Sequence, residues 1–115
     1  MRRGEIRLVD LEPGRGSEAD RTRPAVIVSN DGANAAAARS GRGVLTVVPV
    51  TSNTSRVYPF QILLTAGESG LRQDSKVQAE QVRAVAVERI GRRIGQVPSD
   101  RVAALDAALR LHLGL

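Results

Sequence analysis

The sequence predicts a mainly β (α+β) fold, a small and strongly bent antiparallel β-barrel with a short inserted helix and a C-terminal helix. Short apolar or alternating segments recur along the chain between turn-forming residues, as in small β-rich domains. An alanine-rich segment interrupts them, and apolar residues recur at helical spacing near the end of the chain. The 115 residues suit one domain that spans 1–115.

Strands are expected where apolar or alternating side chains extend over the length of a strand. These segments are 5–11, 24–29, 44–50, 60–64, 76–79 and 83–87. Pro24 is compatible with a strand because it opens one, and Pro49 indicates that its strand finishes at an edge or a bulge. Gly91 and Gly95 are expected to break the strand pattern.

Two helices are expected. Asn30 is suited to cap a helix whose body is 34–39, and Gly41 is suited to end it. The second helix starts after Pro98, with Ser99 as its N-cap residue. Its apolar stripe, which we expect to face the core, consists of Val102, Leu105, Leu109 and Leu113.

The composition favours a charged surface over an aromatic one. Hydrophobic residues make up 42% of the chain, which is typical of a globular protein, but there is one Tyr (Tyr58), one Phe (Phe60) and no Trp. The net charge is +5, and all but one of the 17 basic residues are Arg, whose planar guanidinium suits phosphate. The positive charge and the many Arg residues favour a nucleic-acid partner. A GC-rich genome also produces an excess of Arg over Lys, so composition leaves the two explanations about even.

Several classes of protein are excluded or disfavoured. The chain has no cysteine, which excludes disulfides and thiolate chemistry. No apolar run approaches the roughly 20 residues of a membrane span. The first residues turn polar and acidic too early for a signal peptide, so the cytoplasm is the expected location.

Residues that commonly bind metals or act as bases are sparse. His112 is the only histidine, and we expect it to be a surface or packing residue of the C-terminal helix. A structural zinc site is excluded, and the scattered carboxylates give no argument for magnesium. No glycine-rich phosphate loop joins a strand to a helix. We therefore expect no metal and no cofactor.

Two segments, 21–24 and 49–54, place polar side chains at the ends of buried strands. If both strands belong to one small sheet, Arg23 and Thr51 lie together at its mouth. Taken singly, Arg23 is explained as a solvated surface residue and Thr51 as a turn residue, and these ordinary explanations are favoured about three to one.

A series of short motifs runs along the chain in order. They are Arg3-Gly4-Glu5-Ile6, Gly16-Ser17-Glu18, Arg23-Pro24-Ala25-Val26-Ile27-Val28-Ser29-Asn30-Asp31, Val48-Pro49-Val50-Thr51-Ser52, Tyr58-Pro59-Phe60, Asp74-Ser75-Lys76-Val77, Ala79-Glu80-Gln81-Val82-Arg83 and Glu88-Arg89-Ile90. Each motif is weak alone, but their order and spacing resemble those of the MazF toxin family, which includes the plasmid toxins Kid and PemK. The resemblance covers almost the whole chain.

The resemblance implies a small SH3-like β-barrel of the CcdB/MazF type that works as a homodimer. It implies an endoribonuclease of the mRNA interferase type, which cleaves single-stranded RNA at short sequence motifs. It also implies a MazE-like antitoxin whose acidic, flexible C-terminal tail covers the RNA groove.

The resemblance also assigns roles to individual residues. In the family, the Arg of the Arg-Pro pair and the Thr at the position of Thr51 carry the cleavage, so Arg23 and Thr51 are the expected catalytic residues. Glu18 and Glu80 match positions with a supporting or catalytic part in some members. The histidine that precedes the Arg in some members is Thr22 here, so the resemblance gives no support to a mechanism that needs that imidazole.

The expected chemistry uses the 2′-hydroxyl of RNA as the nucleophile, so it needs no metal where the charge on the phosphorane is stabilised. Arg23 fits this stabilising role, Thr51 would hold a non-bridging oxygen or orient the 2′-hydroxyl, and Glu18 or Glu80 is a candidate base. The products would be a 2′,3′-cyclic phosphate and a 5′-hydroxyl. The expected RNA contacts are Arg21, Ser52, Asn53, Arg56, Tyr58, Gln81 and Arg83. The loops 12–22 and 53–58 are expected to select the RNA motif.

Two other functions stay open. A gyrase-inhibiting toxin like CcdB shares the fold without being an enzyme, but its action depends on a Trp near the C-terminus, and this chain has no Trp. A non-catalytic RNA-binding barrel would use the same Arg-rich surface, but it gives no reason for the Arg-Pro and Pro-x-Thr-Ser segments to occur in family order. Cleavage of RNA in the presence of EDTA separates the three functions.

Overall fold

The computed structural model describes residues 1–13, 15–18 and 21–115. Its strands are β1 (Glu5–Asp10), β2 (Thr22–Ile27), β3 (Val44–Thr51), β4 (Gln61–Leu64), β5 (Ser75–Gln78), β6 (Arg83–Ala86) and β7 (Ile90–Gln96). Its α-helices are α1 (Asp31–Ser40), α2 (Ala66–Ser69) and α3 (Val102–Leu113), and the short 3-10 helices are η1 (Ala79–Gln81), η2 (Val87–Arg89) and η3 (Ser99–Arg101). The predicted mixture of many short strands, an inserted helix and a C-terminal helix is confirmed, whereas α2 was not predicted.

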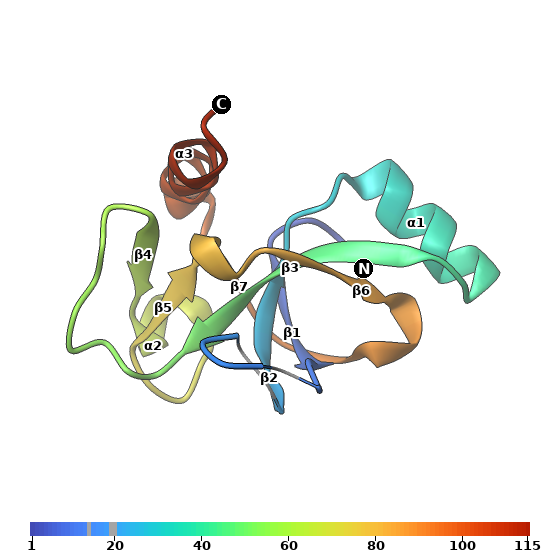
Figure 1. Cartoon of the computed structure of the whole chain (residues 1–115), viewed down its shortest axis with the longest axis horizontal. Coiled ribbons are helices and arrows are strands. Elements are labelled where there is room, and N and C mark those ends of the chain that lie inside the picture. The colour runs from blue at the N-terminus through green and yellow to red at the C-terminus, as the bar shows by residue number, and fades with distance from the viewer. Residues whose placement is uncertain (14, 19–20) are drawn as a thin grey trace.

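The strands form one antiparallel sheet in the order β4-β5-β3-β2-β1-β7, and β6 pairs with β3 beside β5 (Figure 1). The strands β4 and β7 stand at the two ends of this order, and no strand pairing joins them in the described part of the chain. The helix α2, which follows β4, instead makes a close backbone contact with β7, because a Cβ added at Gly95 would lie only 2.4 Å from the Ser69 carbonyl oxygen. The predicted barrel is therefore strongly curled but not closed by hydrogen bonds.

The prediction that Gly91 and Gly95 break the strand pattern is wrong, because β7 runs through both. A Cβ at Gly91 would lie 3.1 Å from the Leu8 carbonyl oxygen, and a Cβ at Gly95 would meet Ser69 at 2.4 Å. Glycine serves here to let other backbone segments approach the strand, which is its other common use inside a sheet. In a sequence, a glycine needed for a tight turn looks the same as a glycine needed for a close packing contact.

Pro24 lies inside β2, and not at the strand start where the sequence placed it, and Pro49 lies inside β3, which continues to Thr51. The Val28 N–H donates to the Thr46 carbonyl oxygen, so these two residues form a hydrogen-bonded pair. Hydrogen-bonded and non-hydrogen-bonded pairs alternate along antiparallel strands. Ala25 and Pro49, three residues further along the same register, therefore form a non-hydrogen-bonded pair. The Pro49 nitrogen therefore faces the other edge of β3. There it falls between the residues that pair with β6 and those that pair with β5, so no strand hydrogen bond is lost.

The ends of α1 follow from local chemistry, as predicted. The Asn30 side chain accepts a hydrogen bond from the Ala33 N–H at 2.8 Å, and Gly41 ends the helix with a left-handed φ of 67°. The predicted Ser99 cap of α3 is wrong, because Ser99 begins η3 and its side chain makes no capping hydrogen bond. In the predicted stripe of α3, Leu105 is buried, but Leu113 is 52% exposed.

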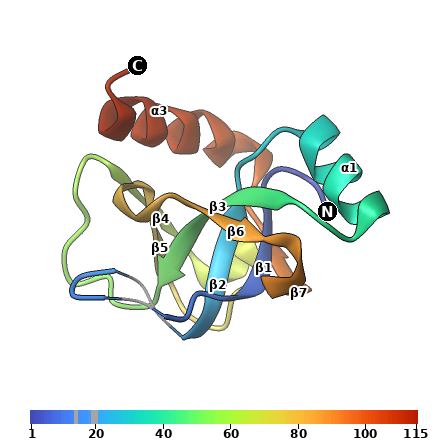
Figure 2. The ribbon, with the colours of Figure 1, turned by 45° about the vertical axis from the view of Figure 1, so that its right-hand side comes forward.

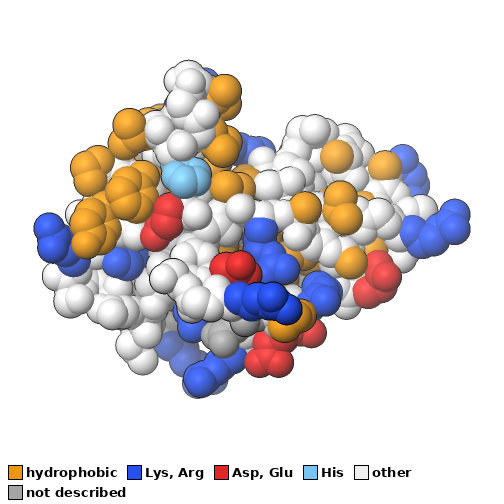
Figure 3. All heavy atoms as spheres, viewed as in Figure 1, with side chains coloured by type: hydrophobic (Ala, Val, Ile, Leu, Met, Phe, Trp, Pro, Cys, Tyr) orange, Lys and Arg blue, Asp and Glu red, His pale blue; other side chains and the backbone are white. Residues whose placement is uncertain are grey.

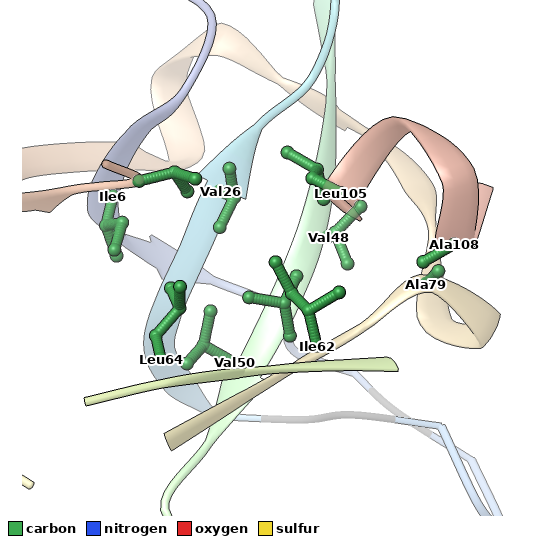
Figure 4. Packing of buried hydrophobic residues seen from close by; sticks show 11 residues of the cluster. Ile6, Val26, Val48, Val50, Ile62, Leu64, Ala79, Leu105 and Ala108 are labelled. Carbon is green, nitrogen blue, oxygen red and sulfur yellow. The ribbon is translucent and has the colours of Figure 1, made fainter. Parts of the chain in front are cut away.

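Two clusters of buried side chains occupy the two sides of the curled sheet. One lies under α3, where Leu105 and Ala108 meet Ala79 of η1 and residues of the strands (Figure 4): Ile6, Val26, Val48, Val50, Ile62, Leu64 and Val77. The other lies under α1 and consists of Val9, Leu11, Ala25, Ile27, Ala37, Leu45, Val47, Val85 and Val87. Figure 2 shows the two helices apart, α3 across one side and α1 beside the start of β3. Each fully buried aliphatic side chain contributes roughly 1.5–3 kcal/mol, so β2 and β3, which supply both clusters, are firmly held.

Candidate active site

The start of β2 and the end of β3 bring Arg23 and Thr51 into one groove. Ala25 pairs with Pro49, and continuing this antiparallel register by two residues sets Arg23 opposite Thr51. The groove has a volume of about 810 Å³. It is lined by Leu8, Arg23, Pro24, Val50, Thr51, Ser52, Gly70, Leu71, Arg72, Gln73, Ser75, Arg92, Arg93 and Ile94. The fold therefore unites the two segments that the sequence marked separately, while the catalytic role of both residues stays a prediction.

The Thr51 hydroxyl is half-buried and oriented. Its Oγ1 accepts a hydrogen bond from the Asn53 backbone N–H at 3.2 Å, in the turn that follows β3. Thr51 thus does bond the backbone of the turn, as its ordinary explanation expects. A hydroxyl that accepts one hydrogen bond still has its proton to donate, so the turn orients a donor in the groove.

The groove is strongly cationic. Four guanidinium groups line it, those of Arg23, Arg72, Arg92 and Arg93, and none of its described lining residues is acidic. Arg stays protonated at any physiological pH, so this charge is permanent. Only Arg23 of the four was predicted. The adjacent pair Arg92-Arg93 was a visible signal, but its sequence position gave no reason to place it beside Arg23.

The loop between β3 and β4 carries the aromatic residues. The Tyr58 and Phe60 rings stack with centroids 5.3 Å apart and an interplanar angle of 7°. The Arg56 guanidinium lies 4.9 Å from the Tyr58 ring centroid. Lys76 is buried and fastens this loop, because its Nζ donates to the Arg56 carbonyl oxygen at 2.6 Å and lies 5.8 Å from the Tyr58 ring. The predicted RNA contacts Asn53, Arg56 and Tyr58 thus stand on one loop beside Thr51, and Tyr58 remains 39% exposed.

The two predicted carboxylates lie in a different place. Glu18 and Glu80 line a second hollow of about 370 Å³, together with Gln81, Val82 and Arg83, and it shares no lining residue with the groove. The Glu80 Oε2 atom accepts from Gln61 Nε2 at 2.8 Å, and the Gln61 Oε1 atom accepts from the Tyr58 N–H at 3.1 Å. Glu80 is therefore connected to the β3–β4 loop through Gln61.

The other predicted RNA contacts divide between the two regions. Ser52 lines the groove, whereas Gln81 and Arg83 line the hollow and donate to the carbonyl oxygens of Ser17 and Leu11, at 2.8 and 3.0 Å. Arg21 is exposed and has a left-handed φ of 65°. Within the loop 12–22 that was predicted to select the RNA motif, residues 14, 19 and 20 lie outside the described residues.

Two negative findings hold for the described residues. No group of three or more His, Cys, Asp or Glu side chains among them is arranged to hold a metal ion. None of their helices has the length and apolar character needed to cross a bilayer. His112 is exposed on α3, as expected.

A curled antiparallel sheet with one helix beside each core cluster, and a cationic groove at the Arg-Pro strand, defines a known class of protein. The sequence profile of the PemK-like, MazF-like toxins of type II toxin–antitoxin systems matches residues 2–113, and the chain belongs to this family. A curated relative, Endoribonuclease MazF9 of Mycobacterium tuberculosis (strain ATCC 25618 / H37Rv), is 64% identical over 115 residues, which are 100% of this chain and 98% of that protein. Probable endoribonuclease MazF1 of the same organism is 70% identical over 57 residues, 50% of this chain and 61% of that protein.

Solved structures agree on the fold. A MazF crystal structure from Deinococcus radiodurans matches with a TM-score of 0.77 and 24% identity, covering 100% of this chain and 97% of that one. A mycobacterial endoribonuclease in complex with its cognate antitoxin matches with a TM-score of 0.76 and 23% identity, covering 100% and 96%. The predicted family, the MazF-like fold and the predicted enzyme class, an endoribonuclease, are confirmed.

Proposed function

We propose that the chain cleaves single-stranded RNA in the groove between Arg23 and Thr51, without a metal ion, by attack of the RNA 2′-hydroxyl on the adjacent phosphorus. The observation that carries this proposal is the meeting of a permanent cation and an oriented hydroxyl in one groove that has no acidic residue among its described lining. A polyanion is the ligand that such a groove attracts.

In this reaction the 2′-oxygen forms a bond to phosphorus and gives up its proton, and the bond from phosphorus to the 5′-oxygen breaks. The 5′-oxygen then takes up a proton from water, which leaves a 2′,3′-cyclic phosphate and a 5′-hydroxyl. Arg23 forms two parallel hydrogen bonds to the non-bridging oxygens and offsets their growing negative charge. A guanidinium is a poor base because its pKa lies above 12, so Arg23 stabilises charge and does not accept the proton.

Thr51 donates its hydroxyl proton to a non-bridging oxygen while the Asn53 N–H holds its Oγ1 in place. Glu18 and Glu80 line the other hollow, so we assign them no direct contact with the phosphate in this conformation. Glu80 instead acts as a positioning residue for the β3–β4 loop through Gln61. The 2′-proton passes to water.

The proposal includes a homodimer and an antitoxin as partners. Exposed apolar side chains, among them Leu63, Leu111 and Leu113, gather over α3 and β4 and offer a surface to a second copy (Figure 3). The cationic groove would receive the acidic, flexible C-terminal tail of a MazE-like antitoxin in place of RNA. Cellular RNA as the substrate places the enzyme in the cytoplasm.

The test is cleavage of a long RNA in EDTA, with the 5′ ends mapped and their phosphorylation state determined. We expect defined cuts with 5′-hydroxyl ends, a loss of about 10²–10³-fold in Arg23→Ala, and a smaller loss in Thr51→Ala. Arg39→Ala, which removes an exposed guanidinium from α1, is the matched control and should cleave like the wild type. Undiminished cutting by Arg23→Ala, or cutting that stops in EDTA, contradicts the proposal. RNA binding without cutting favours a binding barrel, and gyrase inhibition without cutting favours a CcdB-like toxin.

A further inference from the structure

Besides the ends of β2 and β3, the groove is lined by the turn that follows α2 and by β7. The turn contributes the consecutive residues 70–73, and β7 contributes Arg92, Arg93 and Ile94. None of the turn residues was a sequence-predicted contact. The turn and β7 are neighbours in space because Gly95 lets the Ser69 carbonyl approach β7.

This turn is a built structure. In α2, a capping box joins Thr65 and Glu68, and Gly70 ends the helix in the left-handed region at φ 85°. The Ser69 hydroxyl accepts from the Leu71 N–H at 3.2 Å and donates to the Thr65 carbonyl at 2.8 Å. The wall that these residues form is therefore held in place before any ligand binds, which lowers the entropy cost of binding.

The polar side chains of this wall are free to contact a ligand. No hydrogen bond or ion pair with another described residue engages the guanidinium groups of Arg72 and Arg92 or the side-chain amide of Gln73, and all three residues are exposed. Arg93, by contrast, donates to Gln96 Oε1 at 3.0 Å. The groove lining thus includes two unengaged cations and an unengaged amide.

The chemistry of this wall suits one nucleotide of an RNA strand. A glutamine amide has a donor and an acceptor side by side, so it can form two hydrogen bonds with the edge of an unpaired base. Aliphatic side chains such as Leu8, Leu71 and Ile94 line the same groove and offer an apolar surface to the base plane. Guanidinium groups bind phosphate with two parallel hydrogen bonds.

We propose that the turn after α2, together with β7, is the subsite for the nucleotide next to the scissile phosphate, where Gln73 reads the base and Arg72 and Arg92 bind the neighbouring phosphates. The inference rests on the proposed function, because it takes the scissile phosphate to lie at Arg23 and Thr51. It moves part of the motif selection from the loops 12–22 and 53–58 to the turn 70–73.

The test compares the cleavage of a pool of RNAs with randomised positions around a strong wild-type site. In Gln73→Ala the preference at one position next to the cut should disappear, with a loss of about tenfold at the best site, equal to one base contact. Gln73→Glu keeps the acceptors and loses the donors, so the preferred base at that position should change. Arg72→Ala and Arg92→Ala should weaken all sites evenly and lower the slope of log affinity against log salt by about 0.7 each, as expected for one phosphate contact on a single strand.

Two controls separate the possible failures. Arg39→Ala should leave the salt slope unchanged, and thermal melting should show that all of these exposed-residue variants fold like the wild type. If the wild type cuts and Arg23→Ala does not, but Gln73→Ala keeps the full motif or Arg92→Ala keeps the salt slope, the subsite is wrong and the proposed function stands. If the wild type does not cut RNA, or Arg23→Ala cuts as well as it does, the proposed function fails and the subsite fails with it.

Discussion

The groove at Arg23 and the hollow at Glu80 both contain Arg and Gln side chains, but only the hollow has carboxylates among its described lining. The groove combines guanidinium, hydroxyl and amide groups with no acidic residue among its described lining, whereas two carboxylates line the hollow. In the groove, Arg72 and Arg92 are not engaged by other described residues, but in the hollow Glu80 bonds Gln61, which holds the Tyr58 backbone. The comparison teaches that the motifs shared with the MazF family serve two purposes. Some contribute to a groove that can bind an anion, and others hold the loop between β3 and β4 in place.

The largest expected effect comes from separating the groove wall from β7 with Gly95→Ala. The new Cβ would lie 2.4 Å from the Ser69 carbonyl oxygen, so α2 or β7 has to move. We expect a destabilisation of about 1–3 kcal/mol, as for overpacking. The midpoint of thermal unfolding should fall by roughly 4 °C per kcal/mol, and RNA cleavage should fall with it.

Gly67→Ala is the matched control for this variant. Gly67 lies in α2, and an added Cβ would meet nothing within 4 Å beyond its chain neighbours and its own helix backbone, so alanine should fit and stabilise the helix by roughly 0.5–1 kcal/mol. Equal melting temperatures for Gly95→Ala and the wild type would show that the groove wall is not held by this contact.

The next effect tests the hollow through Glu80→Gln and Glu80→Ala. Glutamine can still accept from Gln61, so we expect less than about a threefold change in kcat, because Glu80 would not touch the phosphate. Alanine leaves a buried amide without its partner and should cost about 1–3 kcal/mol in unfolding free energy. A loss of kcat beyond a hundredfold in a well-folded Glu80→Gln variant would make Glu80 the base and would erase the distinction between the two regions.

The smallest effect concerns pH and the turn beside the groove. The Thr65 backbone N–H donates to the Glu68 carboxylate at 2.7 Å and lowers the pKa of Glu68. A carboxyl whose pKa is lower in the folded state stabilises the fold above its unfolded pKa, and this stabilisation disappears as the pH falls through the folded pKa. The melting temperature of Glu68→Gln, which does not titrate, should therefore approach that of the wild type as the pH is lowered below the ordinary range of carboxyl groups. A difference that stays constant with pH would mean that the capping charge contributes nothing.

Sequence reasoning was most successful where a signal and its structure lie a few residues apart. Asn30 and Gly41 define the ends of α1 because each acts on backbone groups within one turn of the helix. It was less successful for Ser99, because a 3-10 turn replaces the expected cap, and for Pro49, whose tolerance depends on which strands flank β3. For the candidate site, the segments of Arg23 and Thr51 were identified, but Arg72, Gln73 and Arg92 were not.

The sequence by itself determined the family, the succession of β1 to β6 with α1 and α3, and the two polar strand ends at Arg23 and Thr51. Only the tertiary structure decided that Gly95 is a contact point within a strand, that Glu80 is separate from the groove, and that β7 and the turn after α2 complete the groove wall. The physical reason is range: capping and alternation depend on bonds between near neighbours, whereas a shared groove depends on how segments far apart in the chain pack together.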